Sequence, residues 1–318
     1  MHIGIDDIGS FAEGSGRAFV AAAVIRPGHS DAARALLRSW EKALPPECRS
    51  PGGEVKGHLV SESALHAFVD EVMLKADPPV RFECVGVDLG PETFTAIRGQ
   101  KSHTSEQMRT GIEQYRSQGR DFHKIANRYE NMLGWWEKLS ESQVLQLIML
   151  THVIPTIVNF AICWSAANGF DDELGDLRIK LDEGFLSTSP EKKVFWKDML
   201  RSHLWQATKT EGGLVTFKEW PEDHPFLRAF FERDLGDGRV ELTPEFKSRI
   251  DFYKSHETFE VRLADIIGAV VRRVPQLPDR FAHQHVERKG WRLLHFTGEK
   301  VVVPSPYEPR EPHRQDGA

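Results

Sequence analysis

The sequence predicts an α/β fold in which helices flank a mixed β-sheet. Two apolar segments near the N-terminus, residues 2–7 and 17–25, are joined by the glycine-rich turn GSFAEGSG, a pattern typical of a β-hairpin. Further strand-like segments at residues 81–89 and 177–183 are separated by stretches with helical apolar spacing. Together, the hairpin and the alternation of later strands with helices indicate the α/β class.

Helices are predicted between these strands and after them. Ser30 is expected to cap a helix that runs to Leu44, and Ser61 to start a second one. Residues 91–170 are expected to be largely helical, which makes them a helical insertion between the third and fourth strands. Residues 257–273, which read ETFEVRLADIIGAVVRR, have a strong helical pattern.

The chain is predicted to form a single domain over residues 1–303. A helix is expected from about Ser189, where Ser-Pro marks a helix start, and a fifth strand at residues 214–220. Residues 304–318 lack an apolar pattern and are expected to be a disordered tail.

Composition sets broad limits on function. Hydrophobic residues make up 40% of the 318 residues and charged residues 28%, as in an ordinary soluble protein. The net charge of −6 leaves no global positive field, which weakens a DNA-coating role but permits a local basic patch. Cys48, Cys84 and Cys163 are scattered and odd in number, which favours a reducing compartment over a disulfide framework or structural zinc.

Residues 144–166, VLQLIMLTHVIPTIVNFAICWSA, are long and apolar enough to span a bilayer. Polar residues interrupt the segment, and no excess of Lys or Arg marks either end. A buried core helix kinked at Pro155 is therefore favoured over a membrane span. The first residues show no signal-peptide pattern, so we expect a cytoplasmic protein with no membrane partner.

Strand alternation places two aspartates on polar faces. Isoleucines alternate with polar residues or glycine in residues 2–7, so Asp6 lies opposite the apolar face. Leucine and isoleucine alternate with basic residues and Asp182 in residues 177–183. If the two strands are neighbours, these carboxylates lie side by side on one face of the sheet. Asp7 and Glu183 point to the opposite faces and are interpreted as structural caps.

The late helix offers a third carboxylate, Asp265, on the flank of its apolar stripe. Gly268, one turn further on, would allow another element to approach closely. The alternative is that Asp265 is a surface residue paired with Arg262 or Arg272. The stripe that would anchor the helix consists of Phe259, Leu263, Ile266 and Val270.

The loop GGEVKG contributes a fourth carboxylate, Glu54, together with Lys56. A solvated loop is the alternative interpretation for both side chains. Gathering like charges in a protein is unfavourable unless a cation joins them. Carboxylate oxygens of this kind suit Mg²⁺ or Mn²⁺.

The segments around these carboxylates resemble those of a widespread bacterial family known as domain of unknown function 3800. The D-E-S-G strand of that family corresponds to IDDIGSF, and its E-x-K loop to EVK at Glu54. Its aspartate after a mid-chain strand corresponds to Asp182 in IKLDEG, and its helix Q-L-A-D-I-I-A-G to RLADIIG around Asp265. The resemblance covers about residues 1–275.

Two departures from the family pattern are present: Asp7-Ile8 stands where Glu-Ser is usual, and Arg262 where Gln is common. The family is related to the ribonuclease H-like fold. The resemblance therefore implies a mixed sheet flanked by helices, with carboxylates on the first strand, the fourth strand and a late helix.

The expected function is that of a metal-dependent nuclease or phosphodiesterase. Two Mg²⁺ or Mn²⁺ ions, roughly 3.5–4 Å apart, would clamp the scissile phosphate. Asp6 would bridge both ions, and Lys56 would contact a phosphate or position water. The expected catalytic residues are Asp6, Glu54, Lys56, Asp182 and Asp265, the four carboxylates being the metal ligands.

The expected nucleic-acid contacts come from the basic stretch 98–128, at Arg109, Arg116, Arg120 and Lys124. A solvated helical face is the alternative for this stretch. Two other functions stay open: a phosphodiesterase acting on a small nucleotide, and a catalytically inactive interaction module. The second would serve as an accessory subunit, with a protein partner, in a bacterial conflict or defence system.

Overall fold

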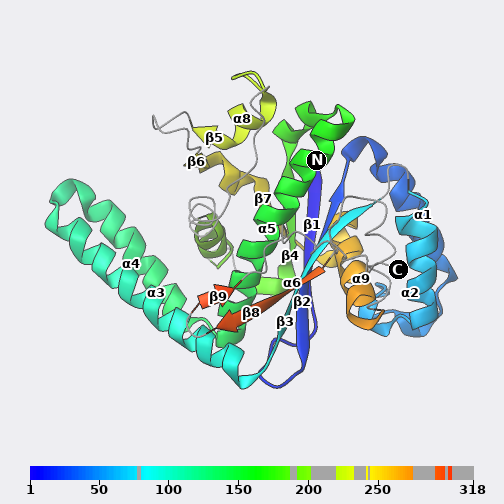
Figure 1. Cartoon of the computed structure of the whole chain (residues 1–318), viewed down its shortest axis with the longest axis horizontal. Coiled ribbons are helices and arrows are strands. Elements are labelled where there is room, and N and C mark those ends of the chain that lie inside the picture. Colours follow the sequence, from blue (N-terminus) through cyan, green and yellow to red (C-terminus); the bar gives the residue numbers. More distant parts are fainter. Residues whose placement is uncertain are drawn as a thin grey trace, which may run out of the picture.

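The mixed sheet predicted from the sequence is present, with helices on both faces (Figure 1). The computed structural model describes residues 1–76, 80–186, 192–201, 220–232, 241–242, 244–274, 291–297 and 300–302. The main sheet has the strand order β7-β4-β1-β2-β3-β8-β9. Its strands are β1 (His2–Ile8), β2 (Arg17–Ile25), β3 (Arg81–Asp88), β4 (Arg178–Asp182), β7 (Ile250–Tyr253), β8 (Trp291–Thr297) and β9 (Lys300–Val302).

The strands pair in both directions. The predicted hairpin is confirmed, since β1 runs antiparallel to β2, and β3 runs antiparallel to β2 on its other side. On the opposite side of β1, strand β4 lies parallel to it, and β7 lies parallel to β4. Strand β8 is parallel to β3 and antiparallel to β9. A second small sheet pairs β5 (Phe231–Glu232) with β6 (Glu241–Leu242).

Two predictions on the middle of the chain fall outside the described residues. Residues 187–191 and 202–219 are not described, so the helix start at Ser189 and the strand at residues 214–220 stay predictions. A helix does cover residues 192–201. The predicted tail, residues 304–318, also lies outside the described residues.

Helices α1 (Ser30–Ala43), α2 (Glu62–Phe68) and α9 (Phe259–Arg273) cover one face of the sheet. They pack on the β1 and β2 side chains that include Ile8 and Ala21. The helix at Ser61 is confirmed, because the Ser61 hydroxyl accepts a hydrogen bond from the amide of Ala64. The cap at Ser30 is wrong: a short 3₁₀ turn precedes this helix, so His29 is the N-cap and Ser30 is the first helical residue.

The other face is covered by α5 (Glu141–Asn168), which contacts β2 and β3 through a row of buried apolar side chains. The helix begins at a capping box formed by Ser140 and Gln143 and ends at Gly169, whose φ of 69° is left-handed. Its length and composition would allow it to cross a membrane, but 61% of its most apolar window is buried inside the protein. This burial agrees with the predicted core helix, with Pro155 in its interior.

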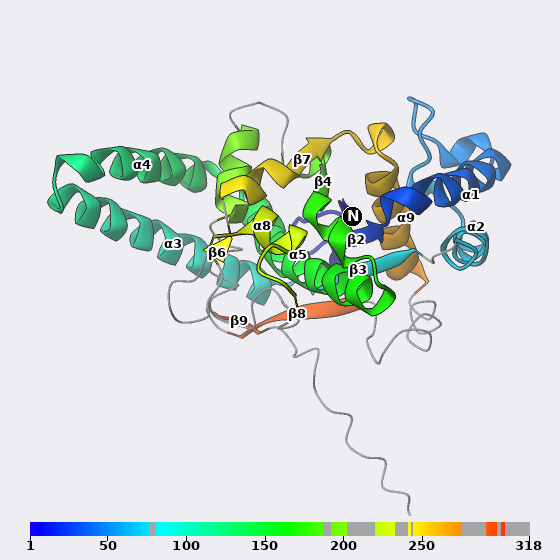
Figure 2. The same ribbon diagram turned by 90° about the horizontal axis from the view of Figure 1, so that it is seen from above.

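The predicted helical insertion is confirmed between β3 and β4. Helices α3 (Pro91–Ser117) and α4 (His123–Lys138) form an antiparallel hairpin that projects from the rest of the molecule (Figure 2). The buried indole of Trp136 donates to the carbonyl of Lys101, and the Lys101 ammonium donates to the carbonyls of Glu137 and Leu139. These bonds fix the base of the hairpin.

Short helical elements complete the described residues. The α-helical ones are α6 (Glu183–Leu186) and α8 (Pro225–Phe230), and Val69–Met73 is a π-helical turn that continues α2. The 3₁₀ turns are Pro27–His29, Pro46–Cys48, Gly57–Leu59, Arg120–Phe122, Asp171–Asp176, Pro244–Arg249 and Ser255–Glu257.

Glycines let α9 lie directly on the sheet. A Cβ atom added at Gly4 of β1 would lie 2.1 Å from the Glu260 carbonyl carbon. A Cβ atom added at Gly268 would lie 1.9 Å from Cδ1 of Ile8, so the close approach expected there is confirmed. Because Glu260 meets Gly4 and Gly268 meets Ile8, α9 runs in the same direction as β1.

We predict that Gly4→Ala destabilises the protein, because the new methyl group would meet the backbone of Glu260, which cannot rotate away. The expected loss in the free energy of unfolding, measured by chemical denaturation, is about 1–3 kcal/mol or more. Gly111→Ala is the matched control, since a Cβ at Gly111 in α3 would meet nothing within 4 Å. This control should gain about 0.5–1 kcal/mol. Equal effects of the two substitutions would contradict the close packing of α9 on β1.

Candidate functional site

The carboxylates of Asp6 and Asp182 lie at neighbouring strand ends. Ile5 of β1 pairs with Leu181 of β4 in a parallel register, and the two aspartates occupy the next position on each strand. Asp6 is only 6% exposed. The prediction that these carboxylates share a face depended on the two strands being neighbours, and β1 does pair with β4.

Helix α9 adds the third carboxylate, Asp265, to the same face. One of its oxygens, Oδ2, accepts a 3.0 Å hydrogen bond from the backbone N–H of Gly57. Gly57 itself packs so closely that an added Cβ would lie 2.7 Å from Cβ of Ala269. The alternative surface pairing of Asp265 with Arg262 is not what forms, since Arg262 makes its ion pair with Glu41.

The loop before α2 brings Glu54 and Lys56 to this cluster. The Lys56 ammonium lies 3.0 Å from Oε2 of Glu54 and donates to the Ser255 hydroxyl at 3.0 Å. The Glu54 side chain is 12% exposed, and its other oxygen, Oε1, is buried without a hydrogen-bond partner in the part of the chain that the structure describes. The solvated-loop alternative for these two residues is therefore wrong.

The three aspartates act on one another electrostatically. Burial raises the pKa of Asp6 well above its usual value, and the charges of Asp265 and Asp182 raise it further. Burial also raises the pKa values of Asp182 and Asp265, with the charge of Glu54 adding to both, while the Lys56 ammonium opposes the shift. The residues from β1, β4, α9 and the loop thus form one site, which we call the carboxylate cluster.

In each carboxylate of the cluster, one oxygen is held by a hydrogen bond or an ion pair. The other oxygen is open, meaning that it has no such partner among the described residues. The backbone N–H groups of Asp7, Gly184 and Gly57 donate to Asp6 Oδ1, Asp182 Oδ2 and Asp265 Oδ2, at 2.8, 2.9 and 3.0 Å. In Glu54 the held oxygen is Oε2, which Lys56 pairs. The second oxygen of each group has no hydrogen-bond partner among the described residues. Four oxygens therefore stay available for a ligand.

The two neighbouring acids have other partners: alternation correctly places Asp7 on the opposite face, whereas Glu183 is not in the strand, because β4 ends at Asp182 and Glu183 begins α6. Asp7 accepts a 2.9 Å hydrogen bond from the Gln146 side chain of α5, on the other side of the sheet. Burial raises the pKa of Asp7 to about 6. Glu183 pairs with Lys193 at 2.6 Å. Both acids therefore contact side chains of neighbouring helices: Asp7 contacts α5, and Glu183 contacts the helix over residues 192–201.

Sequence reasoning missed a second polar cluster on the same face, centred on Glu260 of α9. This side chain is 3% exposed and lies 3.0 Å from His2 Nδ1 and 3.0 Å from the Lys180 ammonium. Burial alone would raise the pKa of Glu260, but hydrogen bonds from His2 and Lys180 lower it to about 2. Lys180 therefore pairs with a carboxylate of the protein itself. A signal was present, because His2 and Lys180 share polar strand faces with Asp6 and Asp182.

The four basic residues predicted to bind nucleic acid divide into two pairs. Arg109 forms an ion pair with Glu137, and Arg116 with Glu130, so both tie α3 to α4. Arg120 and Lys124 are exposed near the turn of the hairpin. The solvated-face alternative thus describes the stem of the hairpin better than a continuous phosphate track does.

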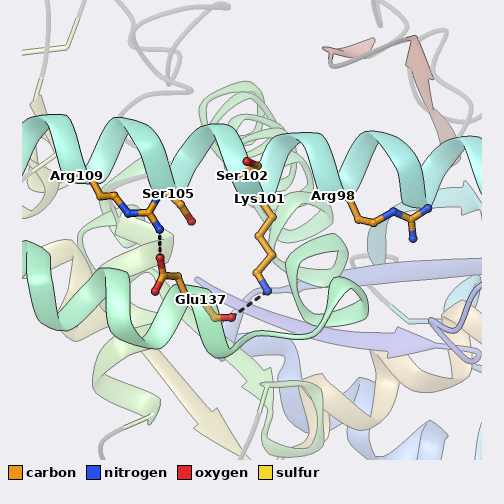
Figure 3. A pocket seen from close by; sticks show the side chains of 6 residues that line it. All are labelled: Arg98, Lys101, Ser102, Ser105, Arg109 and Glu137. Carbon is orange, nitrogen blue, oxygen red and sulfur yellow. Dashed lines mark hydrogen bonds and ion pairs between the residues drawn. The ribbon is translucent and has the colours of Figure 1, made fainter.

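A separate pocket of about 250 Å³ lies between α3 and the end of α4 (Figure 3). Its cations already have protein partners. Arg109 points to the Glu137 carboxylate, Lys101 to the Glu137 carbonyl, and Arg98 pairs with Glu141. The lining residues are Arg98, Lys101, Ser102, Ser105, Arg109 and Glu137. The contacts of these lining residues join α3 to α4. The pocket contains no residue of the carboxylate cluster.

No protein-family model, curated protein or solved structure matches the chain. Inference about function therefore rests on the carboxylate cluster. Its donor atoms are the oxygens that Mg²⁺ and Mn²⁺ prefer. In the described residues, no three His, Cys, Asp or Glu side chains stand close enough to hold an ion together. The arrangement thus has the chemistry of a metal site without its closed coordination shell.

The raised pKa values predict how the metal-free protein responds to pH. A carboxyl group with a higher pKa in the folded state binds its proton more tightly when folded, so the free energy of unfolding falls as pH rises through that interval. For Asp7 the interval runs from its ordinary value of 3.8 to about 6. We expect Asp7→Asn to be more stable than the wild type at pH 7, by up to about 3 kcal/mol. The difference should disappear near pH 4.

The measurement is chemical denaturation at several pH values in the presence of a chelator. Asp6→Asn should change stability in the same direction, since its charge is also unfavourable in the folded state. Asp31→Asn is the control, because that side chain is 94% exposed. A stability difference between the wild type and Asp7→Asn that is the same at pH 4 and pH 7 would contradict the pKa assignment.

Proposed function

We propose that the protein is a divalent-metal-dependent phosphodiesterase that cleaves nucleic acid at the carboxylate cluster. The observation that carries this proposal is the pairing of one held with one open oxygen on Asp6, Glu54, Asp182 and Asp265. Backbone hydrogen bonds fix the orientation of the aspartates, and unsatisfied oxygens in a buried, acidic site favour a cation.

The sheet supports a ribonuclease H-like fold for this protein. That fold carries carboxylates on the first strand, the fourth strand and a late helix, and here Asp6, Asp182 and Asp265 come from β1, β4 and α9. The parallel pairing of β1 with β4 brings two of them together, and the direction of α9 along β1 brings the third. The resemblance to domain of unknown function 3800 leads to the same residues and adds Glu54 and Lys56.

The residues present suit Mg²⁺ or Mn²⁺, although their side chains stand apart. Metal-free carboxylates repel one another, and a shared cation would remove that repulsion. The ions, when bound, would supply the nucleophilic water and neutralise the leaving oxygen. The charges of Asp265 and Asp182 both raise the pKa of Asp6, so Asp6 is the residue that would contact both ions. Glu54, Asp182 and Asp265 would complete the coordination from either side.

Other parts of the chain prepare this site. The Lys56 ammonium bridges Glu54 and Ser255, so it holds the loop in place and adds one positive charge beside the acids. The backbone N–H of Gly57 prevents the Asp265 carboxylate from turning away. Burial of Asp6 excludes water from the centre of the site, which strengthens every electrostatic interaction there.

One observation favours a second candidate, an interaction module without chemistry. The described side chains do not form a group able to hold an ion as they stand. Such a module would keep the fold and bind a protein partner, as an accessory subunit of a bacterial conflict or defence system. A small nucleotide is the remaining alternative substrate. Whichever of these functions holds, we propose that the protein is cytoplasmic.

The decisive test is cleavage of labelled DNA, RNA and nucleotides with Mg²⁺ or Mn²⁺. We predict that Asp6→Asn and Asp182→Asn each lower the rate by at least about a hundredfold, because each removes an anionic ligand of the divalent ions on which cleavage would depend. Mn²⁺ should also raise the thermal midpoint of the wild type and lose this effect in Asp6→Asn, since only a bound ligand stabilises the folded state.

The next residue along the chain supplies a matched control for each aspartate. Asp7→Asn and Glu183→Gln remove the same charge one position along the chain, but from side chains that bond to Gln146 and Lys193. Both controls should keep metal-dependent cleavage. Cleavage that survives both Asp6→Asn and Asp182→Asn would reject the site. A wild type that binds no metal and cleaves nothing would favour the interaction module.

A further inference from the structure

Helix α9 carries an arginine, Arg272, near the carboxylate cluster, and no hydrogen-bond or ion-pair partner of Arg272 lies among the described residues. It follows Asp265 by seven residues, which is close to two full helical turns, so both side chains leave the same side of the helix. Along β1, the helix meets Gly4 at Glu260 and Ile8 at Gly268, and it meets Gly9 at Arg272. Arg272 thus lies just beyond the strand end that carries Asp6.

The guanidinium of Arg272 is placed by the β1–β2 turn. Gly9 has a φ of 101°, and a Cβ atom there would lie 3.2 Å from Nη1 of Arg272. The absence of a side chain at Gly9 therefore leaves room for the guanidinium against the backbone of the turn. Because φ is positive at Gly9, another residue type would be strained there as well.

Arg272 differs from the other cations around the site. Lys56 pairs with Glu54, Lys180 with Glu260, and Lys193 with Glu183. Arg272 is exposed, and among the described residues it makes neither an ion pair nor a hydrogen bond. A guanidinium has donors arranged for bidentate binding of phosphate, and an unpaired one beside an acidic site suits an anionic ligand.

We propose that Arg272 anchors a flanking phosphate of a polynucleotide strand whose scissile phosphate lies at the carboxylate cluster. This inference rests on the proposed function and narrows its substrate. Seven helical residues rise about 10 Å, whereas successive phosphates of one duplex strand are about 3.4 Å apart along the axis. Arg272 thus contacts a different phosphate from the one at Asp6. A strand provides such a phosphate and a mononucleotide does not.

The chain offers a matched control in the next residue, Arg273. It has the same charge and belongs to the same last turn of α9, but its guanidinium donates to the carbonyl of Val60. Removing Arg273 leaves that carbonyl without its donor, so Arg273→Ala should destabilise the fold more than Arg272→Ala. If the arginines act only through the fold, Arg273→Ala should weaken oligonucleotide binding more than Arg272→Ala does. If Arg272 anchors a phosphate, Arg272→Ala should weaken binding more.

The experiment measures binding of a labelled oligonucleotide by fluorescence anisotropy in EDTA, so that no cleavage occurs. We expect Arg272→Ala to weaken binding about tenfold, the loss of one charge-assisted hydrogen bond. The slope of log affinity against log salt should fall in magnitude by about 0.7–0.9, the value for one phosphate contact. Arg273→Ala should leave the slope unchanged, and Arg272→Lys should keep most of it.

A chemical substitution locates the phosphate. Oligonucleotides with one neutral methylphosphonate at successive positions should bind the wild type less tightly at one flanking position, and Arg272→Ala should be insensitive to that position. Equal slopes for Arg272→Ala and Arg273→Ala would overturn the proposal, as would a wild type that binds a mononucleotide as tightly as the oligonucleotide or binds neither. Should Arg272→Ala fail to fold, Arg272→Gln, which also removes the charge but keeps a long side chain, takes its place with the same expected fall in slope.

The two proposals fail in different ways. Binding that depends on Arg272 without cleavage under Mg²⁺ or Mn²⁺ would sustain the anchor and reject the nuclease activity. Cleavage that is metal-dependent but equally sensitive to salt in the Arg272 and Arg273 variants would sustain the nuclease activity and reject the anchor.

Discussion

The contact between α9 and β1 is the constraint on which the site depends. It is possible because Gly4 and Gly268 have no side chains, so the helix backbone rests on the strand. At one end of the contact, buried Glu260 forms a hydrogen bond with His2 and an ion pair with Lys180, and these two contacts fix the rotation of the helix. A buried carboxylate without these partners would be strongly unfavourable, so the helix has one orientation in which Glu260 is satisfied. In that orientation Asp265 faces Asp6.

The same face of the sheet therefore contains two acidic clusters with opposite electrostatics. Around Glu260 the protein supplies hydrogen bonds from His2 and from the Lys180 ammonium, and the pKa of the carboxyl is lowered to about 2. Around Asp6 the neighbours are further carboxylates, and the pKa is raised. The first cluster stabilises the fold by itself, whereas the second is destabilising until a proton or a cation is added. Charge that the protein leaves uncompensated in one cluster, while compensating it in the next, indicates a site prepared for a ligand.

Much of this arrangement could be predicted from period-two and helical patterns. Alternation placed Asp6 and Asp182 on polar faces because each strand has one apolar side, and the structure adds their parallel pairing. The position of Gly268 predicted a close approach, and Ile8 is the residue that makes it. The carboxylate of Asp7 was correctly placed off the face, since one residue along a strand reverses its side, whereas Glu183 begins helix α6 and alternation does not apply to it.

What sequence patterns did not reveal are contacts between residues far apart in the chain. Glu260 and His2 are separated by 258 residues, and nothing local to either predicts their bond. The basic stretch misled for the same reason: the acids that neutralise Arg109 and Arg116 lie on the returning helix α4. A charge run on one helix has no electrostatic meaning until its partner helix is known. Arg272 stands out only by comparison with Lys56, Lys180 and Lys193, because each of these cations near the site has an acidic partner and Arg272 has none among the described residues.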